Sequence, residues 1–278
     1  MCNAVTKTLS LALCLFTMAI ATSCGGNSEE KRAEQLLAEA QTALDNNDYN
    51  LVKTLIDSIN SSCPAAIDQR RQALHLATRA KEGLTVVKLQ QADSLLAVLS
   101  VRSDSLGKLV KFVQNPIEGY YVGKNTDPLS FTNSTGLQAR MTPNGDFYLV
   151  SSLHGIKINS TAISVGGVDS TPVPYDGERN DRSFGNEVIT FMGSECDAIG
   201  RTIAEHAGEQ MILIFKGDKD YRTTLKPAQT QEIANVYNLA SCMRAVRVAS
   251  LEKDRLQKSV DIARSQAART FVEPDSLK

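Results

Sequence analysis

The sequence predicts an α+β protein in which helical segments flank a β-rich domain. Apolar residues recur at three- and four-residue intervals before residue 116 and after residue 227, which is typical of amphipathic helices. Between these stretches Gly, Thr, Ser and β-branched residues become frequent and short apolar runs appear, which indicates strands. The 278 residues are 42% hydrophobic and 22% charged, the composition of a folded globular protein.

Residues 1–23 are predicted to be a secretory signal. Lys7 supplies positive charge, residues 9–21 are almost entirely apolar, and the small residues Ala21, Thr22 and Ser23 precede Cys24. An apolar run this short is a signal-peptide core, because a membrane-spanning helix needs about 20 apolar residues. The small residues also suit ordinary signal-peptide cleavage, so export is predicted with or without lipid attachment.

Residues 20–24, Ile-Ala-Thr-Ser-Cys, resemble the lipobox of bacterial lipoproteins, although Ala21 stands where that family prefers Leu. The resemblance implies that Cys24 is acylated, becomes the mature N-terminus and anchors the protein to a membrane, with residues 24–29 as the lipidated Cys and its linker. The following Asn-Ser-Glu-Glu is similar to the surface-export tag of Bacteroidota lipoproteins, which implies an outer-membrane location exposed at the cell surface. The same residues suit a helix start, with Ser28 as N-cap and two acids near the positive helix end.

Residues 30–82 are predicted to be helical and to begin with a helical hairpin. The break between its helices is the Asn-Asn-Asp run at 46–48, because these side chains compete for backbone hydrogen bonds. Pro64 is well placed to open the next helix. The apolar faces comprise Ala33, Leu36, Leu37, Ala40, Ala43 and Leu44 in the first helix, and Val52, Leu55, Ile56 and Ile59 in the second.

This hairpin is similar to a tetratricopeptide repeat (TPR). Ala40 stands at the small position of the first helix, residues 47–49 at the turn, and Pro64 at the terminal proline. Val52 and Ile59 depart from the family, which prefers Ala there, and no second copy follows 34 residues later. Because one repeat cannot bury its own face, we expect the hairpin to pack on the next helix or on a partner.

Two long helices are expected on either side of the β-rich domain. A third helix at 65–80 is followed, after Gly83, by a long helix within 83–116. The second long helix occupies 227–270 and leaves a tail at 271–278. We expect the long helices to pair antiparallel; the alternative is a shorter helix folded back on the sheet. The predicted seams comprise Leu95, Leu99, Arg102, Leu106, Leu109 and Val113, and then Val236, Leu239, Met243, Val246, Leu256, Val260, Ala263 and Ala267.

Residues 117–226 are predicted to form the β-rich domain. The clearest signal is a hairpin of 137–141 and 146–153 around the Asn144-Gly145 turn. Further strands are expected at 119–123, 156–158, 162–165, 187–191, 210–216 and 221–225, with a short helix at 197–206.

Composition excludes several functions. Lys and Arg number 30 against 31 acids, so the net charge of −1 offers neither a nucleic-acid footprint nor polybasic attraction to membranes. Aromatic residues are scarce at 5%, with no Trp, which disfavours a dedicated glycan surface. Cys63, Cys196 and Cys242 lack metal-site spacing, so we expect small buried apolar residues and at most one disulfide within the chain.

The sequence contains no recognisable catalytic or metal constellation. The three histidines, His75, His154 and His206, are far apart, and no GxSxG motif is present. We therefore predict no catalytic residue, no metal ligand and no cofactor. The most polar loop of the β-rich domain is the candidate partner-binding segment. Its candidate residues are Asp176, Glu178, Arg179, Asp181 and Arg182.

These observations predict a non-enzymatic, lipid-anchored cell-envelope protein that presents a binding or assembly surface to a protein partner. The order of its segments resembles Bacteroidota envelope lipoproteins of unknown function. One alternative is a coiled-coil spacer that oligomerises through a seam containing Leu99 and Leu106. Another is an envelope hydrolase whose active-site residues converge only in three dimensions.

Overall fold

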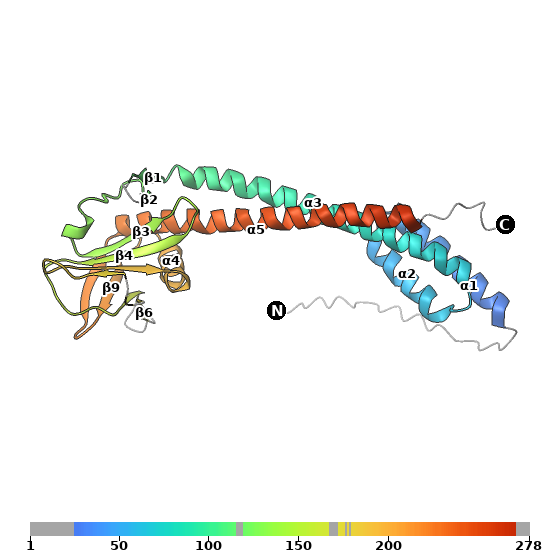
Figure 1. Cartoon of the computed structure of the whole chain (residues 1–278), viewed down its shortest axis with the longest axis horizontal. Helices are drawn as coiled ribbons and strands as arrows, with labels where there is room; N and C mark the ends of the chain where they lie inside the picture. The colour runs from blue at the N-terminus through green and yellow to red at the C-terminus, as the bar shows by residue number, and fades with distance from the viewer. Residues whose placement is uncertain (1–24, 115–118, 167–171, 176, 178, 271–278) are drawn as a thin grey trace, which may run out of the picture. The chain divides into compact units, whose positions relative to one another are not determined.

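A computed structural model describes residues 25–114, 119–166, 172–175, 177 and 179–270 (Figure 1). Over these residues the fold is α+β, with five α-helices and two antiparallel sheets. The chain divides into two compact units. Unit 1 comprises residues 1–85 and 260–278, and unit 2 comprises residues 86–259.

Unit 1 is helical. It contains α1 (Gly25–Asp45), α2 (Tyr49–Ser62), the first part of α3 (Ile67–Gly107) and the last part of α5 (Pro227–Thr270). The α1–α2 turn is where the sequence predicts it: Asn47 is left-handed with φ 61°, and Asp48 caps α2 by accepting from Leu51 N at 3.1 Å. Small side chains dominate the core, which comprises Ala33, Ala40, Ala43, Val52, Ile56, Ile59, Cys63, Ala66, Ala73, Leu76 and Ala80.

Two predicted boundaries in this region are wrong. Helix α1 begins at Gly25, so the predicted linker at 24–29 is largely helical. Helix α3 is continuous through Gly83, which does not loosen it. A Cβ at Gly83 would lie 2.3 Å from the Tyr49 ring, so this glycine provides room for a neighbouring side chain.

The predicted long helix at 83–116 also ends early. Helix α3 stops at Gly107, and Val110–Val113 forms β1, which pairs with Tyr120–Gly123 of β2. The apolar spacing at 106, 109 and 113 fits a helix. Residues 110–113 form a strand instead, because they pair with β2. The β-rich domain therefore begins before residue 117.

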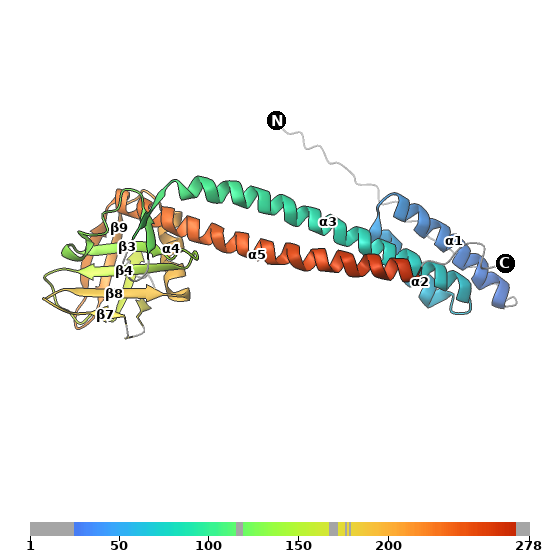
Figure 2. The same ribbon diagram turned by 45° about the horizontal axis from the view of Figure 1, so that its top comes forward.

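Unit 2 contains both sheets, and all paired strands are antiparallel. One sheet has the order β1-β2-β3-β4-β8-β7 and the other β10-β9-β5-β6 (Figures 1 and 2). The remaining elements are β3 (Gly136–Met141), β4 (Phe147–Leu153), β5 (Ala162–Gly166), β6 (Val173–Pro174), β7 (Asn180–Asp181), β8 (Glu187–Met192), β9 (Met211–Lys216), β10 (Tyr221–Leu225), the 3-10 helix η1 (Phe131–Asn133) and α4 (Ser194–Glu205).

The predicted β3–β4 hairpin is confirmed. Met141 pairs with Phe147, and Gly145 takes φ 85° in the turn. The strands expected near 119–123, 162–165, 187–191, 210–216 and 221–225 are present, and so is the short helix. The strand expected at 156–158 is not, because backbone N–H groups there bind a carboxylate. The two-residue strands β6 and β7 are too short for a periodic signal.

One hydrophobic core joins the two sheets, α4 and the start of α5. Its largest fully buried side chains include Phe191, Phe215, Leu149 and Leu213, which come from both sheets. Helix α5 contributes Val236 and its neighbours.

In unit 2 the two long helices also contact each other (Figures 1 and 2). Lys253 Nζ lies 2.7 Å from Asp93 Oδ1, and Cys242 Sγ lies 3.5 Å from the Leu99 carbonyl oxygen. The predicted α3 seam is wrong at alternate positions, because Leu95, Arg102 and Leu109 are exposed. The less exposed positions are Leu89, Ala92, Leu96, Leu99, Ser103 and Leu106. The inward-facing row is shifted by one residue, for example from Leu95 to Leu96. Because both residues are apolar, the sequence pattern does not show which of them faces inward.

Candidate functional site

A groove of about 780 Å³ lies in unit 1, bounded by α2 and the first part of α3. We call it the α2–α3 groove. Its volume lies within the range of ligand-binding sites. Its apolar members are Ile56, Ile67, Leu74, Ala77, Ala80 and Leu84, and its cationic members are Lys53, Arg70, Arg71 and Lys81.

Helical periodicity builds this groove. On α2 the lining residues Asn50, Lys53 and Asp57 share one face, whereas Val52 and Ile59 point into the unit 1 core. On α3 the lining residues also recur every three or four positions from residue 67 to residue 84. Each helix therefore uses one face for stability and leaves another open.

The groove exposes large apolar side chains. Ile67 is 65% exposed and Leu74 is 54% exposed, while Ile56 at 5% forms a closed floor. Exposed apolar residues are common singly, but these lie together in one concavity. Covering them would remove apolar surface from water, which is the main driving force for most protein association.

The groove is also cationic. Four basic side chains face one acid, Asp57, a net of +3 in a chain whose total charge is −1. Arg70 is oriented at the corner between the helices, where Nε donates to Asn60 Oδ1 at 3.3 Å and Nη1 to the Pro64 carbonyl at 3.2 Å. Arg71 lies 4.0 Å from Asp68 in an exposed pair, which contributes little stability.

Tyr49 is an aromatic member of the groove lining. Its ring lies over Gly83, and its hydroxyl lies 2.8 Å from Asn47 Oδ1 in the preceding turn. The α1–α2 turn therefore positions an aromatic side chain in the groove.

The predicted partner-binding loop lies in unit 2 and is separate from this groove. Asp176 and Glu178 lie outside the described residues. Arg182 Nη2 donates to the Ser160 carbonyl at 2.6 Å and to the Tyr175 hydroxyl at 3.1 Å. Asp181 Oδ1 accepts from Ser183 N at 3.0 Å, and Arg179 O accepts from Thr190 N at 2.9 Å. These contacts brace the loop against its own scaffold.

Glu187 is the most buried carboxylate of unit 2 among the described residues, with 1% of its surface exposed. It accepts from the backbone N–H groups of Ile158, Asn159 and Ser160 at 2.8, 2.7 and 2.7 Å. Burial alone would raise the pKa of Glu187, but hydrogen bonds from Ser160 and from the Ile158 and Asn159 N–H groups hold it below its usual value. Glu187 thereby ties β8 of one sheet to the segment that enters β5 of the other.

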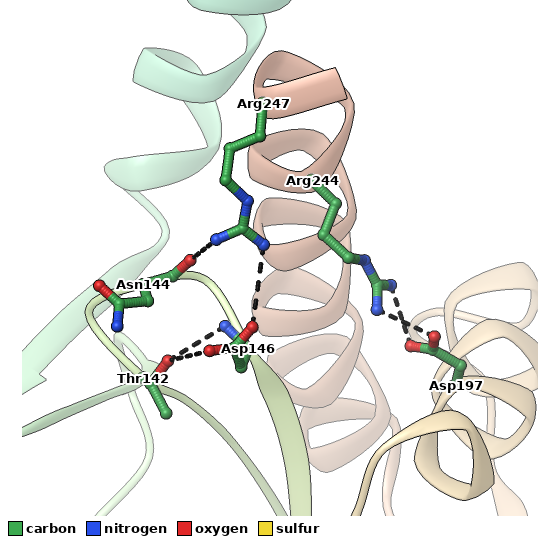
Figure 3. Close-up of polar contacts among 6 residues, drawn as sticks. All are labelled: Thr142, Asn144, Asp146, Asp197, Arg244 and Arg247. Carbon is green, nitrogen blue, oxygen red and sulfur yellow. Dashed lines mark hydrogen bonds and ion pairs between the residues drawn. The ribbon is translucent and has the colours of Figure 1, made fainter. Parts of the chain in front are cut away.

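Two arginines on α5 bind this helix to the rest of unit 2 (Figure 3). Arg244 makes a bidentate pair with Asp197 of α4, with both N–O distances 2.9 Å. Arg247 donates to the Asn144 carbonyl in the β3–β4 turn and lies 3.8 Å from Asp146. These contacts fix α5 against both α4 and the hairpin and leave no obvious reactive group.

Chemistry-bearing residues are dispersed over the described part of the chain. Cys63, Cys196 and Cys242 are buried thiols, as predicted for small apolar residues. Within the described residues no three His, Cys, Asp or Glu side chains gather as a metal site would require. His75 lines a hollow of about 490 Å³ in unit 1. Burial and the neighbouring Arg79 lower the pKa of His75.

Cys24, the predicted lipidation residue, lies outside the described residues. Among the described helices α3 alone is long and apolar enough to cross a membrane, with a mean hydropathy of 1.3 over its best window. Its apolar stretch at 84–101 contains Lys88 and Asp93, each costly in a bilayer. Asp93 is moreover paired with Lys253 of α5. Only 6% of that window is buried, so α3 has exposed apolar surface.

Sequence reasoning missed the α2–α3 groove. The sequence does contain basic residues between apolar ones, at 53, 70, 71 and 81. They predict a groove only if α2 and α3 are known to be adjacent. No protein-family model, curated protein or solved structure matches this chain.

Proposed function

We propose that this chain is a non-enzymatic, lipid-anchored envelope protein that binds a segment of a partner protein in its α2–α3 groove. The observation that carries the proposal is the groove itself, in which exposed Ile67 and Leu74 lie among four basic side chains. An apolar floor supplies binding free energy, and a predominantly basic rim selects the partner.

The groove chemistry defines the partner segment. It carries apolar side chains that cover Leu74 and Ile67, together with Asp or Glu opposite Lys53 and Arg71. A helical segment with apolar anchors every three or four residues matches a groove of this kind. Because the charges are exposed, raising the salt concentration should weaken binding without abolishing it.

The anchor and the helices complete the proposal. Acylation of Cys24 tethers the chain to the outer membrane, at the cell surface if the acidic run at 29–30 acts as an export tag. The α1–α2 hairpin, similar to a TPR, rests on α3 and uses its open face for the partner. The two long helices pair antiparallel, consistent with the Asp93–Lys253 and Leu99–Cys242 contacts.

Site-specific photo-cross-linking in live cells tests the groove. A benzophenone side chain at Leu74, 54% exposed, should form one discrete protein adduct. The matched control is Leu51 of α2, which is 44% exposed and lies outside the groove. Adding Lys53→Glu and Arg71→Glu should abolish the Leu74 adduct.

The contrary results are equally clear. Equal adducts at Leu74 and Leu51, or a Leu74 adduct that survives both charge reversals, would contradict a basic apolar binding groove.

A further inference from the structure

The last turns of α5 lie against the first part of α3 in unit 1 (Figures 1 and 2). Lys81 Nζ donates to Gln266 Oε1 at 3.4 Å, and Thr270 Oγ1 lies 2.9 Å from Thr78 Oγ1. Rising residue numbers on α5 meet falling numbers on α3, so the two helices run antiparallel here. Lys81 also lines the α2–α3 groove, and α5 therefore reaches the edge of that groove.

The α3 face that meets α5 continues beyond the last described contact. Steps of four and three residues place five side chains on this face: Ile67, Arg71, Leu74, Thr78 and Lys81. Helix α5 touches the face at Lys81 and Thr78, and its described part ends at Thr270. The next apolar members, Leu74 and Ile67, are 54% and 65% exposed and line the groove. The face therefore stays open just past the end of α5.

The residues that follow Thr270 have the chemistry expected of a groove ligand. Residues 271–278 lie outside the described residues, and their sequence is Phe-Val-Glu-Pro-Asp-Ser-Leu-Lys. Phe, Val and Leu supply apolar side chains, while Glu273 and Asp275 supply acids. The segment has a net charge of −1, opposite a groove lining with a net charge of +3. Both properties are those inferred for the partner segment.

The order of the side chains matches as well. From Thr78 toward the start of α3 the groove lining has an apolar side chain, two bases and an apolar side chain: Leu74, Arg71, Arg70 and Ile67. From Thr270 onward the sequence has an apolar pair, two acids and then a leucine. A segment that runs antiparallel to α3 therefore sets apolar groups against apolar groups and acids against bases.

The segment is long enough to cover the open face. Thr78 and Ile67 are 11 residues apart on α3, about 17 Å along the helix axis. An extended chain advances about 3.3–3.6 Å per residue, so roughly five residues span that distance. Eight residues follow Thr270 in the sequence. Helix α5 moreover points along this face, because it runs antiparallel to α3.

We propose that residues 271–278 bind in the α2–α3 groove of the same chain and compete there with the partner. This internal ligand rests on the proposed function in one respect, since its competitor is the partner inferred for the groove. A segment tethered beside its site has an effective concentration of about 1 mM, so a contact with a dissociation constant near that value fills about half of the grooves. The partner then binds more weakly, in proportion to the fraction of grooves left open.

Photo-cross-linking of the purified full-length protein, without any partner, tests the internal ligand. A benzophenone side chain at Leu74 should form an adduct within the chain, which peptide mass spectrometry maps to residues 271–278. The matched control is the same probe at Leu51, which is 44% exposed in unit 1 but lies outside the groove. Adding Glu273→Lys and Asp275→Lys should lower the Leu74 adduct severalfold, because like charges then face one another.

In cells, the same double reversal should raise the Leu74 adduct with the partner about twofold, because the half of the grooves that the segment filled becomes open. An unchanged or weaker partner adduct would overturn the competition.

Three results with the purified protein would overturn the internal ligand itself. They are equal yields at Leu74 and Leu51, a Leu74 adduct that maps outside residues 271–278, and an adduct that joins two copies of the chain. A Leu74 adduct that survives the double reversal would contradict the charge match. These readouts need no partner. A segment adduct in the purified protein, with no partner adduct in cells, would contradict the proposed function and leave the internal ligand standing.

Discussion

Replacing Glu187 with glutamine should destabilise unit 2 by about 3 kcal/mol. The native carboxylate accepts three backbone N–H groups, two on Oε1 and one on Oε2. Glutamine keeps one acceptor oxygen but presents an NH₂ group to the Ser160 N–H. One hydrogen bond to a charged acceptor, about 1.5–3 kcal/mol, is lost, and the other two lose their charge assistance.

Urea denaturation measures the loss, and hydrogen exchange at residues 158–160 locates it. The pKa of Glu187 is lowered in the folded state, so its contribution is complete above about pH 4.3 and is lost as pH falls through the folded pKa. The difference in free energy of unfolding between the native chain and Glu187→Gln should therefore become smaller in acid. The control is Glu205→Gln, at an exposed carboxylate. Equal stabilities of the two variants at pH 7 would refute this reasoning.

Three further predictions concern unit 2. Leu99→Asp should cost about 2–3 kcal/mol because Leu99 is half-buried and its carbonyl oxygen lies 3.5 Å from Cys242 Sγ of α5, whereas Val98→Asp, at a 66% exposed position, should cost under about 0.5 kcal/mol. Equal melting temperatures of the two variants would contradict the seam. Phe184 is 99% exposed and has φ 52° in a Ser183–Asn186 turn. Because Asn adopts a positive φ more readily than Phe, Phe184→Asn should raise the free energy of unfolding by about 1 kcal/mol. A lower melting temperature of this variant would contradict backbone strain at Phe184. A double-mutant cycle on Arg244 and Asp197 should give a coupling of about 1 kcal/mol, and zero coupling would exclude a stabilising bidentate pair.

Local signals predicted much of the fold. The β3–β4 hairpin closes through a Thr142–Gly145 turn in which Gly145 takes the left-handed conformation that glycine favours. The Asn-Asn-Asp run ends α1 and supplies the Asp48 cap of α2. Pro227 opens α5 at the expected residue.

Features that depend on distant contacts were not predictable. Gly83 has a packing role that only the position of Tyr49 reveals. Residues 110–113 have helical spacing, yet they pair with β2. The α2–α3 groove brings Lys53 to residues about 20 positions later, which no local window contains.

The partner-binding role of the polar loop stays a prediction. Its charge density suggested a binding segment, and Arg182 bonds to the Ser160 carbonyl elsewhere in unit 2. A polar sequence between strands does not distinguish a loop that binds others from one that braces its own fold.

The central claim is that this chain works as a tethered binding protein, and the mass of its native N-terminal peptide tests the tether most directly. We predict that the mature chain purified from its own envelope begins at Cys24 and carries fatty-acyl groups. A mature chain that begins elsewhere, or an unmodified Cys24 in a protein recovered free of membrane, would contradict the account.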